Sequence, residues 1–121
     1  MLSENLLAID VGTTGVRAIL FRDNGDIVSS SYMEYESVYP KPGWVEQSAE
    51  MWWYGVKKTV SQVIKNKDLS ALSITNQRET IVPIGKKGKP LRDAIVWQDR
   101  RSTKECKMIK DELGEDKIYE I

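Results

Sequence analysis

The 121-residue sequence contains no histidine, and its only cysteine is Cys106. The absence of histidine removes the commonest zinc ligand and the usual general base of enzymes that work near neutral pH. A single cysteine excludes a disulfide within the chain. Any acid–base or metal chemistry must therefore rely on the carboxylates of aspartate and glutamate.

Long apolar runs are also missing. No stretch approaches the length of a membrane span, and residues 1–5 lack the charged-then-apolar pattern of a secretory signal. The 18 lysines and arginines are balanced by 18 aspartates and glutamates, which disfavours a nucleic-acid partner bound mainly by charge. We therefore expect a cytoplasmic protein without a membrane or nucleic-acid partner. A hydrophobic content of 40% supports a modest core, so the chain is one domain or part of one.

Two standard phosphate-binding motifs are absent, because the sequence contains neither Gly-x-x-x-x-Gly-Lys-Ser/Thr nor Gly-x-Gly-x-x-Gly. The stretch from Leu6 to Phe21 offers a different candidate. Its apolar runs at 6–9 and 16–21 flank a polar turn, which predicts two strands joined by a tight connection. On this segment alone, a glycine-rich hairpin without a ligand is the simpler interpretation, because short motifs recur by chance.

The turn between these two strands carries groups suited to phosphate chemistry. Asp10 ends the first predicted strand, where a carboxylate can be held toward Mg²⁺. Gly12 and Gly15 allow unusual backbone angles and leave room for a ligand to contact the main chain. The other polar side chains of this segment are those of Thr13, Thr14 and Arg17. Together with the backbone N–H groups they supply donors and positive charge, which phosphoryl transfer requires.

The next elements are predicted by a turn signal and by helical periodicity. Asn24-Gly25 indicates a hairpin, so a third strand is expected over residues 26–35. Residues 36–47 contain two prolines and should form a connecting loop. A helix is expected over 49–66, with Ser48 as its N-cap. Its expected buried face consists of Ala49, Trp52, Trp53, Val56, Val60, Val63 and Ile64.

Residues 69–75 form a short apolar run after that helix. A right-handed crossover would place this strand parallel to the first one. Ligands of open α/β sheets bind beyond the carboxyl ends of the strands. We therefore expect the polar loop at 76–80 to face the same crevice as Asp10.

The remaining segments predict a ribbon and a second helix. Residues 80–84 and 91–97 are interpreted as two strands around a lysine-rich turn. A capping box that begins at Ser102 starts a helix, and Gly114 ends it. Its apolar face is expected to contain Cys106, Ile109 and Leu113.

Four segments, taken in order, resemble the amino-terminal region of the FGGY carbohydrate kinases. They are IDVGTTGVR at 9–17, YPKPGWVEQ at 39–47, ITNQRET at 74–80 and AIVWQDRR at 94–101. The resemblance covers nearly the whole chain, and the ordered set is far more specific than any one segment. It implies an α/β fold of the ribonuclease-H-like, actin-like ATPase type, in which two lobes close over ATP and a polyol. Residues 1–121 would correspond to the first part of the first lobe.

The resemblance also implies a role for the polar groups of the turn. Asp10 would hold the catalytic Mg²⁺, directly or through water. The phosphates of ATP would bind at Gly12, Thr13, Thr14 and Arg17. The resemblance therefore implies ATP and Mg²⁺ as the cofactors.

In the second polar loop, Arg78 and Glu79 match the pair that holds the hydroxyls of the polyol. A guanidinium donates and a carboxylate accepts, so together they can orient a vicinal diol. Trp97 matches the aromatic residue that packs on the carbon backbone of the substrate. Without the resemblance, the first two would be an exposed pair of little energetic consequence, and the tryptophan a core residue. The tryptophans interpreted as packing residues are Trp44, Trp52 and Trp53.

The loop at 76–80 favours glycerol as the substrate, with glycerol 3-phosphate as the product. Asp99 is more reminiscent of kinases that act on pentuloses such as xylulose, which rank second. Family members that act on glycerol usually have glutamine at position 11 and serines at 15 and 16, where this chain has Val11, Gly15 and Val16. An actin-like ATPase and a non-catalytic binding module remain alternatives from other functional classes.

The resemblance places the general base of the reaction on an aspartate beyond residue 121. Attack by an alcohol needs a base within hydrogen-bond reach of the hydroxyl. We therefore expect the chain to be inactive alone. We also expect exposed apolar surface on its sheet, prone to pairing with another copy and forming a homo-oligomer.

Overall fold

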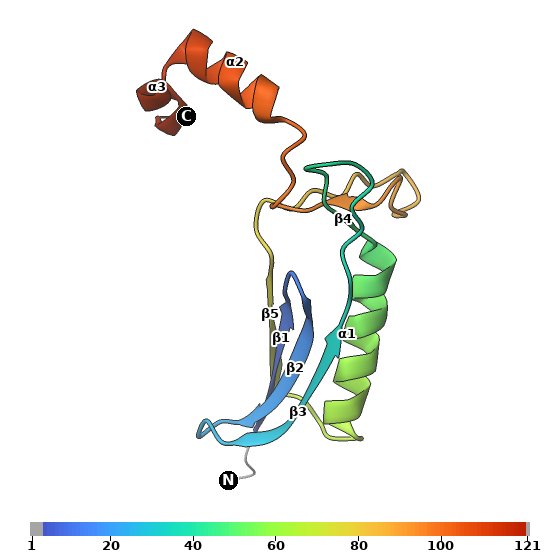
Figure 1. Ribbon diagram of the computed structural model, residues 1–121. Helices are drawn as coiled ribbons and strands as arrows, with labels where there is room; N and C mark the ends of the chain where they lie inside the picture. Colours follow the sequence, from blue (N-terminus) through green and yellow to red (C-terminus); the bar gives the residue numbers. More distant parts are fainter. Residues whose placement is uncertain (1–3, 121) are drawn as a thin grey trace.

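A computed structural model describes residues 4–120 (Figure 1). Its main sheet has four strands in the order β3-β2-β1-β5. These strands span Asn5–Val11 (β1), Gly15–Arg22 (β2), Ile27–Glu34 (β3) and Ala71–Asn76 (β5). The first three form an antiparallel meander and β5 runs parallel to β1, so the predicted partial α/β fold is confirmed.

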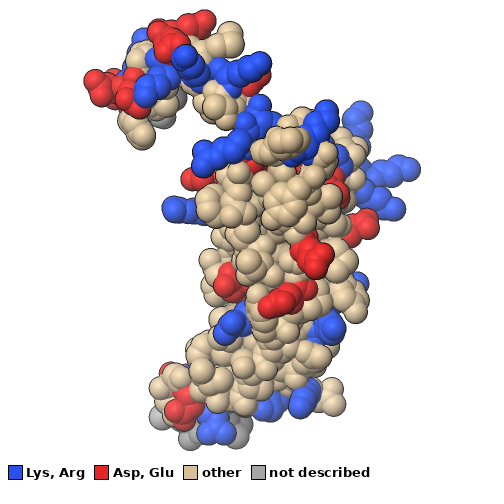
Figure 2. Space-filling view, in the orientation of Figure 1, with Lys and Arg blue, Asp and Glu red and all other residues tan. Residues whose placement is uncertain are grey.

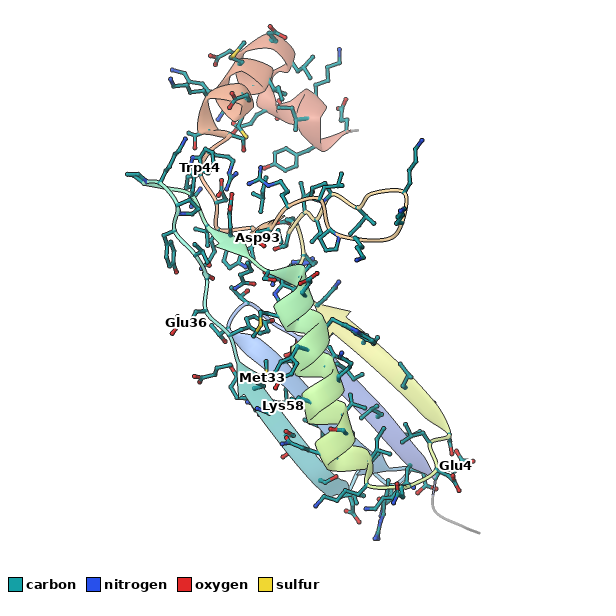
Figure 3. All side chains as sticks on the ribbon, turned by 90° about the vertical axis from the view of Figure 1, so that its right-hand side faces the viewer. Glu4, Met33, Glu36, Trp44, Lys58 and Asp93 are labelled. Atoms are coloured by element: carbon teal, nitrogen blue, oxygen red, sulfur yellow. The ribbon has the colours of Figure 1, made fainter. Side chains whose placement is uncertain are left out.

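Helix α1 (Ala49–Ile64) covers one face of this sheet (Figure 3). A Cβ atom on Gly55 would lie 3.0 Å from side-chain atoms of both Met33 and Val16, so glycine lets the helix lie close to the strands. Burial of apolar side chains between the two layers stabilises them. The buried core consists of Leu7, Ile9, Val16, Ala18, Leu20 and Val63.

Two details of α1 differ from the prediction. Trp53 is 62% exposed, whereas Gly55 and Thr59 are buried. Residues 55, 59 and 63 follow one another at helical spacing along the face toward the sheet, and Thr59 donates its hydroxyl to the carbonyl of Gly55 at 2.9 Å. Ser48 occupies the N-cap position, but its side chain makes no capping hydrogen bond.

Strand β5 forms one edge of the sheet, and all six of its residues are exposed. Leu72 and Ile74 have exposed fractions of 60% and 59%. The expected exposed apolar surface is therefore confirmed. Pairing of this edge with another copy stays a prediction.

A small second sheet lies beyond the main one. It joins β4 (Glu46–Gln47) to β6 (Ala94–Ile95), whereas the sequence predicts a loop over 36–47. The predicted strand 91–97 is shortened to β6, and the predicted strand 80–84 is reduced to the isolated bridges of Ile81 with Ile95 and of Ile84 with Pro90. A proline cannot donate to a strand ladder, which limits regular pairing in this ribbon. Lysine and arginine side chains gather at this end of the molecule (Figure 2).

Helices α2 (Thr103–Leu113) and α3 (Glu115–Tyr119) extend away from the sheets (Figure 1). Gly114 has a φ of 79° and ends α2, as predicted. The side chain of Ser102 does not cap the helix, so the predicted capping box is wrong; the hydroxyl of Thr103 instead donates to the carbonyl of Arg100 at 2.7 Å. Neither helix buries a residue, so the face containing Cys106 stays exposed. Among residues 4–120, no helix has the length and apolar character needed to cross a membrane.

Candidate functional site

The turn at residues 12–15 connects β1 to β2, and its ends are joined by a hydrogen bond from Gly12 N–H to the carbonyl of Gly15 at 3.0 Å. Neither Gly12 nor Gly15 has a positive φ, so the prediction that these glycines provide unusual backbone angles is wrong. The structure gives a different reason for Gly15. A Cβ atom there would lie 2.5 Å from the carbonyl oxygen of Met33, which leaves no room for a side chain.

One pocket brings together the loop at 76–80 and the turn at 12–15, which is named the phosphate turn below because the sequence predicts that it binds phosphate. Its lining residues are Thr13, Gln77, Arg78, Glu79 and Trp97, and its volume is about 290 Å³. The two loops meet because β1 and β5 are parallel neighbours and end at the same edge of the sheet, where Gln77 N–H donates to the carbonyl of Val11 at 3.1 Å. The two loops therefore meet as predicted, but Asp10, which was expected to face the same crevice, is not among the residues that line this pocket.

Trp97 is hydrogen-bonded to both loops, through its backbone N–H to Thr80 and through its indole to Thr13. Its indole N–H donates to the hydroxyl of Thr13 at 2.9 Å, and the side chain is 52% exposed. A core residue would be buried, so the core interpretation of this tryptophan is wrong. The ring offers an apolar surface beside polar groups, which suits a ligand with carbons and hydroxyls.

Arg78 and Glu79 reach the pocket from the loop after β5, and both are exposed. Within residues 4–120 neither takes part in an ion pair, so both keep their hydrogen-bonding capacity for a ligand. Glu79 has a φ of 63°, a left-handed conformation that side chains other than glycine rarely adopt. Such conformations cluster at binding and catalytic sites.

Asp10 and Arg17 do not line this pocket. They lie opposite each other in the register of β1 and β2, and they alternate with the buried residues Ile9 and Val16, so they face away from α1. The guanidinium of Arg17 lies over the ring of Tyr32, 5.1 Å from its centroid.

Thr14 also belongs to this second group, because its hydroxyl lies 3.3 Å from the hydroxyl of Tyr32. The turn backbone separates the two groups and stays close to both. A Cβ atom on Gly12 would lie 3.9 Å from each carboxylate oxygen of Asp10. The predicted phosphate residues are thus placed on the two sides of one turn.

The carboxylate of Asp10 fits the way in which proteins bind Mg²⁺ together with a nucleotide. Mg²⁺ keeps several waters and usually takes one or two carboxylates plus phosphate oxygens. Asp10 is exposed, and in the part of the chain that the structure describes its side chain has no ion-pair partner. Those residues contain no group of three possible ligands, so they do not offer a metal cage made of protein alone.

Tyr35 is a site residue that the sequence analysis missed. Its hydroxyl donates to the carbonyl of Gly12 and holds the start of the turn. Burial, the charge of Asp10 and the neighbouring Tyr32 raise the pKa of Tyr35 from 10.0 to about 12. The hydroxyl therefore remains a donor throughout the physiological pH range. No short motif marks such a tyrosine, because its partner is 23 residues away in the sequence.

Alkaline unfolding of the chain tests the role of Tyr35. A raised pKa means that the folded chain holds the proton more tightly, so this stabilisation is complete below pH 10.0 and is lost as the pH rises toward about 12. We expect Tyr35→Phe to lower the free energy of unfolding by about 0.5–1.5 kcal/mol at neutral pH. Urea titrations at several pH values would measure both effects. If the free energy of unfolding falls equally with rising pH in the wild type and in the variant, this role is wrong.

A second polar cluster fixes the segment that carries Trp97. The Asp99 carboxylate accepts hydrogen bonds from the backbone N–H groups of Val45 at 2.7 Å and Arg101 at 2.8 Å, and from the Arg101 guanidinium at 2.7 Å. These bonds, led by those of Arg101, hold the pKa of Asp99 well below its usual range. The guanidinium also pairs with Glu46 at 2.7 Å and lies 3.8 Å from the centroid of the Trp44 ring. Asp99 therefore ties loop 38–47 to the segment after β6.

Comparison with known proteins identifies the family of the chain. Residues 5–121 match the N-terminal domain of the FGGY family of carbohydrate kinases. The chain belongs to this family. Among the similar relatives of this FGGY chain, a glycerol kinase of Leptospira biflexa is 49% identical over 111 residues, which are 87% of this chain and 22% of the relative. A glycerol kinase of Halothermothrix orenii is 42% identical over 99% of this chain and 25% of the relative. The FGGY chain therefore spans about a quarter of the length of these curated relatives.

Solved structures confirm the fold of this FGGY chain. A gluconate kinase from Lactobacillus acidophilus superposes with a TM-score of 0.89 at 22% identity, over 98% of this chain and 24% of that one. The Plasmodium falciparum glycerol kinase with ADP gives a TM-score of 0.80 at 29% identity, over 90% of this chain and 23% of that one. The predicted FGGY lobe architecture is thus confirmed.

Proposed function

We propose that this chain is the first part of the first lobe of an ATP-dependent kinase that phosphorylates a small polyol. Glycerol is the first candidate substrate, with glycerol 3-phosphate as the product. The observation that carries the proposal is the pocket in which Thr13 of the phosphate turn meets Arg78, Glu79 and Trp97. A nucleotide tail and a diol bound at these two loops would lie next to each other.

On the nucleotide side, the turn would bind phosphate through backbone N–H groups and the hydroxyls of Thr13 and Thr14. Arg17 would add a permanent positive charge on the face that Asp10 shares. Asp10 would hold Mg²⁺, which neutralises phosphate charge when bound. Tyr35 keeps the Gly12 carbonyl engaged, which restricts the turn before the ligand arrives.

On the polyol side, the Arg78 guanidinium would donate to hydroxyl oxygens and the Glu79 carboxylate would accept from hydroxyl protons. Trp97 would pack on the carbon atoms of the substrate. A ligand without hydroxyls would leave these polar groups without partners, so the pocket would select a polyol. The general base and the adenine site would come from the part of the protein that follows this chain.

A pentulose such as xylulose is the second candidate, because Asp99 resembles the residue found in pentulose kinases. In the structure, the Asp99 carboxylate is engaged by Val45 and Arg101, and it is not among the residues that line the pocket. This observation favours glycerol over xylulose.

A chimera tests the proposal. This chain would replace the matching first part of the Leptospira biflexa glycerol kinase, to which it is 49% identical. We expect ADP formation that depends on glycerol, and no turnover by the chain alone. A folded chimera that prefers xylulose would support the second candidate. Hydrolysis of ATP without any dependence on a polyol would contradict the kinase proposal and favour an actin-like ATPase.

A further inference from the structure

A buried glutamine joins the phosphate turn to three other segments. Gln47 is 1% exposed. Its Nε2 donates to the carbonyl of Thr13 at 2.7 Å and to the hydroxyl of Ser37 at 2.8 Å. Its Oε1 accepts from the indole of Trp52 and from Nε2 of Gln77, both at 3.1 Å. Both donors and both lone pairs of the amide are therefore in use.

Gln77 carries this connection to the second loop. Its Nε2 also approaches the carbonyl of Gly12 at 3.4 Å, and its Oε1 accepts from the hydroxyl of Thr80 at 2.9 Å. The same hydroxyl accepts from the backbone N–H of Trp97 at 3.1 Å, and the indole of Trp97 returns to Thr13 at 2.9 Å. The hydrogen bonds form a closed ring that passes through Thr13, Gln47, Gln77, Thr80 and Trp97.

We propose that Gln47 and Gln77 are positioning residues that hold the phosphate turn and the loop at 76–80 in one fixed arrangement. The ring joins the turn, β4, the end of β5 and the Trp97 segment, so a shift of one of them breaks a bond in the ring. Hydrogen bonds in such networks strengthen one another, and a buried amide that loses a partner is costly. A role of this hydrogen-bonded ring in catalysis rests on the proposed function, whereas its role in holding the two loops together does not.

The alternative is that Gln47 only packs β4 against the end of α1. The two roles differ in what they predict for Trp97, which is in the ring but makes no hydrogen bond with Gln47. A local packing role predicts that Gln47→Leu disturbs Thr13 and Trp52, which it touches. A positioning role predicts that the backbone N–H of Trp97 also responds, although its own partner is Thr80.

Amide hydrogen exchange measured by NMR on the 121-residue chain distinguishes these views. In Gln47→Leu and in Gln77→Leu we expect exchange of the Gly12 and Trp97 N–H groups to become about tenfold faster, which corresponds to about 1.4 kcal/mol of local opening free energy. Gln62→Leu is the control, because Gln62 is exposed on α1. It should leave both amides unchanged.

Thr80→Val is a second test that does not depend on the folding of Gln47→Leu. It keeps the size of the side chain and removes the hydroxyl that joins Gln77 to Trp97. It should also speed exchange of Gly12 N–H, which Thr80 does not touch. If each substitution affects only its direct partners, the positioning role is wrong. Unchanged exchange in all variants would also contradict it.

Kinetics of the chimera separate this inference from the proposed function. Gln77→Leu should raise KM for both ATP and glycerol by about tenfold, and Gln62→Leu should change neither. If the substitutions speed exchange across the ring but the chimera shows no polyol-dependent turnover, the proposed function is wrong and the positioning role stands. If the chimera turns over but each substitution affects only its direct partners, the positioning role is wrong and the proposed function stands.

Discussion

Asp10→Asn is expected to lower kcat for glycerol phosphorylation in the chimera by about 10²- to 10³-fold. The substitution keeps the shape of the side chain and removes its charge. Phosphoryl transfer depends mainly on positioning and charge neutralisation, so loss of the carboxylate that is proposed to hold Mg²⁺ should reduce turnover more than stability. Steady-state kinetics over a range of Mg²⁺ concentrations would measure the effect.

The control for this substitution is Asp68→Asn, because Asp68 is exposed and lies before β5, away from the turn. It should leave kcat within about twofold of the unmodified chimera, since surface changes away from a site have small effects. Thermal unfolding should show both variants folded. Asp10→Asn with unchanged kcat at every Mg²⁺ concentration would remove Asp10 from the proposed mechanism.

Arg78→Ala is expected to raise KM for glycerol by about 10- to 100-fold, because hydrogen bonds to charged groups are worth about 1.5–3 kcal/mol. KM for ATP should change by less than about twofold, because Arg78 is proposed to bind the polyol and not the nucleotide. Initial rates with each substrate varied in turn would measure the two constants.

Arg22→Ala provides the matched control, because Arg22 is exposed at the end of β2 that is remote from the turn. It should change neither KM. An actin-like ATPase would be indifferent to Arg78→Ala, so unchanged kinetics in that variant would contradict polyol binding by this loop. A rise in KM for ATP alone would instead assign the guanidinium to the nucleotide.

The main sheet could be predicted from the sequence because each signal in it is local. The apolar runs on either side of residues 10–15 predict β1 and β2, and Asn24-Gly25 predicts the turn to β3. The handedness of crossover connections then places β5 beside β1. The shared crevice follows, since parallel neighbours end at the same edge of the sheet.

Strand β6 lies within the predicted strand 91–97, but β4 and its pairing with β6 could not be predicted, because a strand of two residues shows no period. Trp53 was wrongly placed in the core for a related reason. Helical spacing predicts which residues share a face, but the width of the buried face depends on the size of the sheet that it covers. Here β5 is an open edge, and Trp53 and Ile74 both line a pocket between α1 and this edge.

The polar side chains that hold the turn in place also could not be predicted from the sequence. Tyr35 and Gln47 act on carbonyl groups 23 and 34 residues away. Side-chain bonds to distant backbone carbonyls leave no spacing rule behind. Most of the residues that the resemblance assigned to ligands are exposed, whereas Gln47 is buried and Tyr35 is half-buried.

A crystal structure of the chimera with ADP and glycerol tests the central claim most directly. We expect hydroxyl groups of glycerol within hydrogen-bond distance of Arg78 and Glu79, its carbon atoms against Trp97, and the ADP phosphates beside the N–H groups of residues 12–15. Glycerol bound elsewhere, or phosphates remote from this turn, would contradict the account.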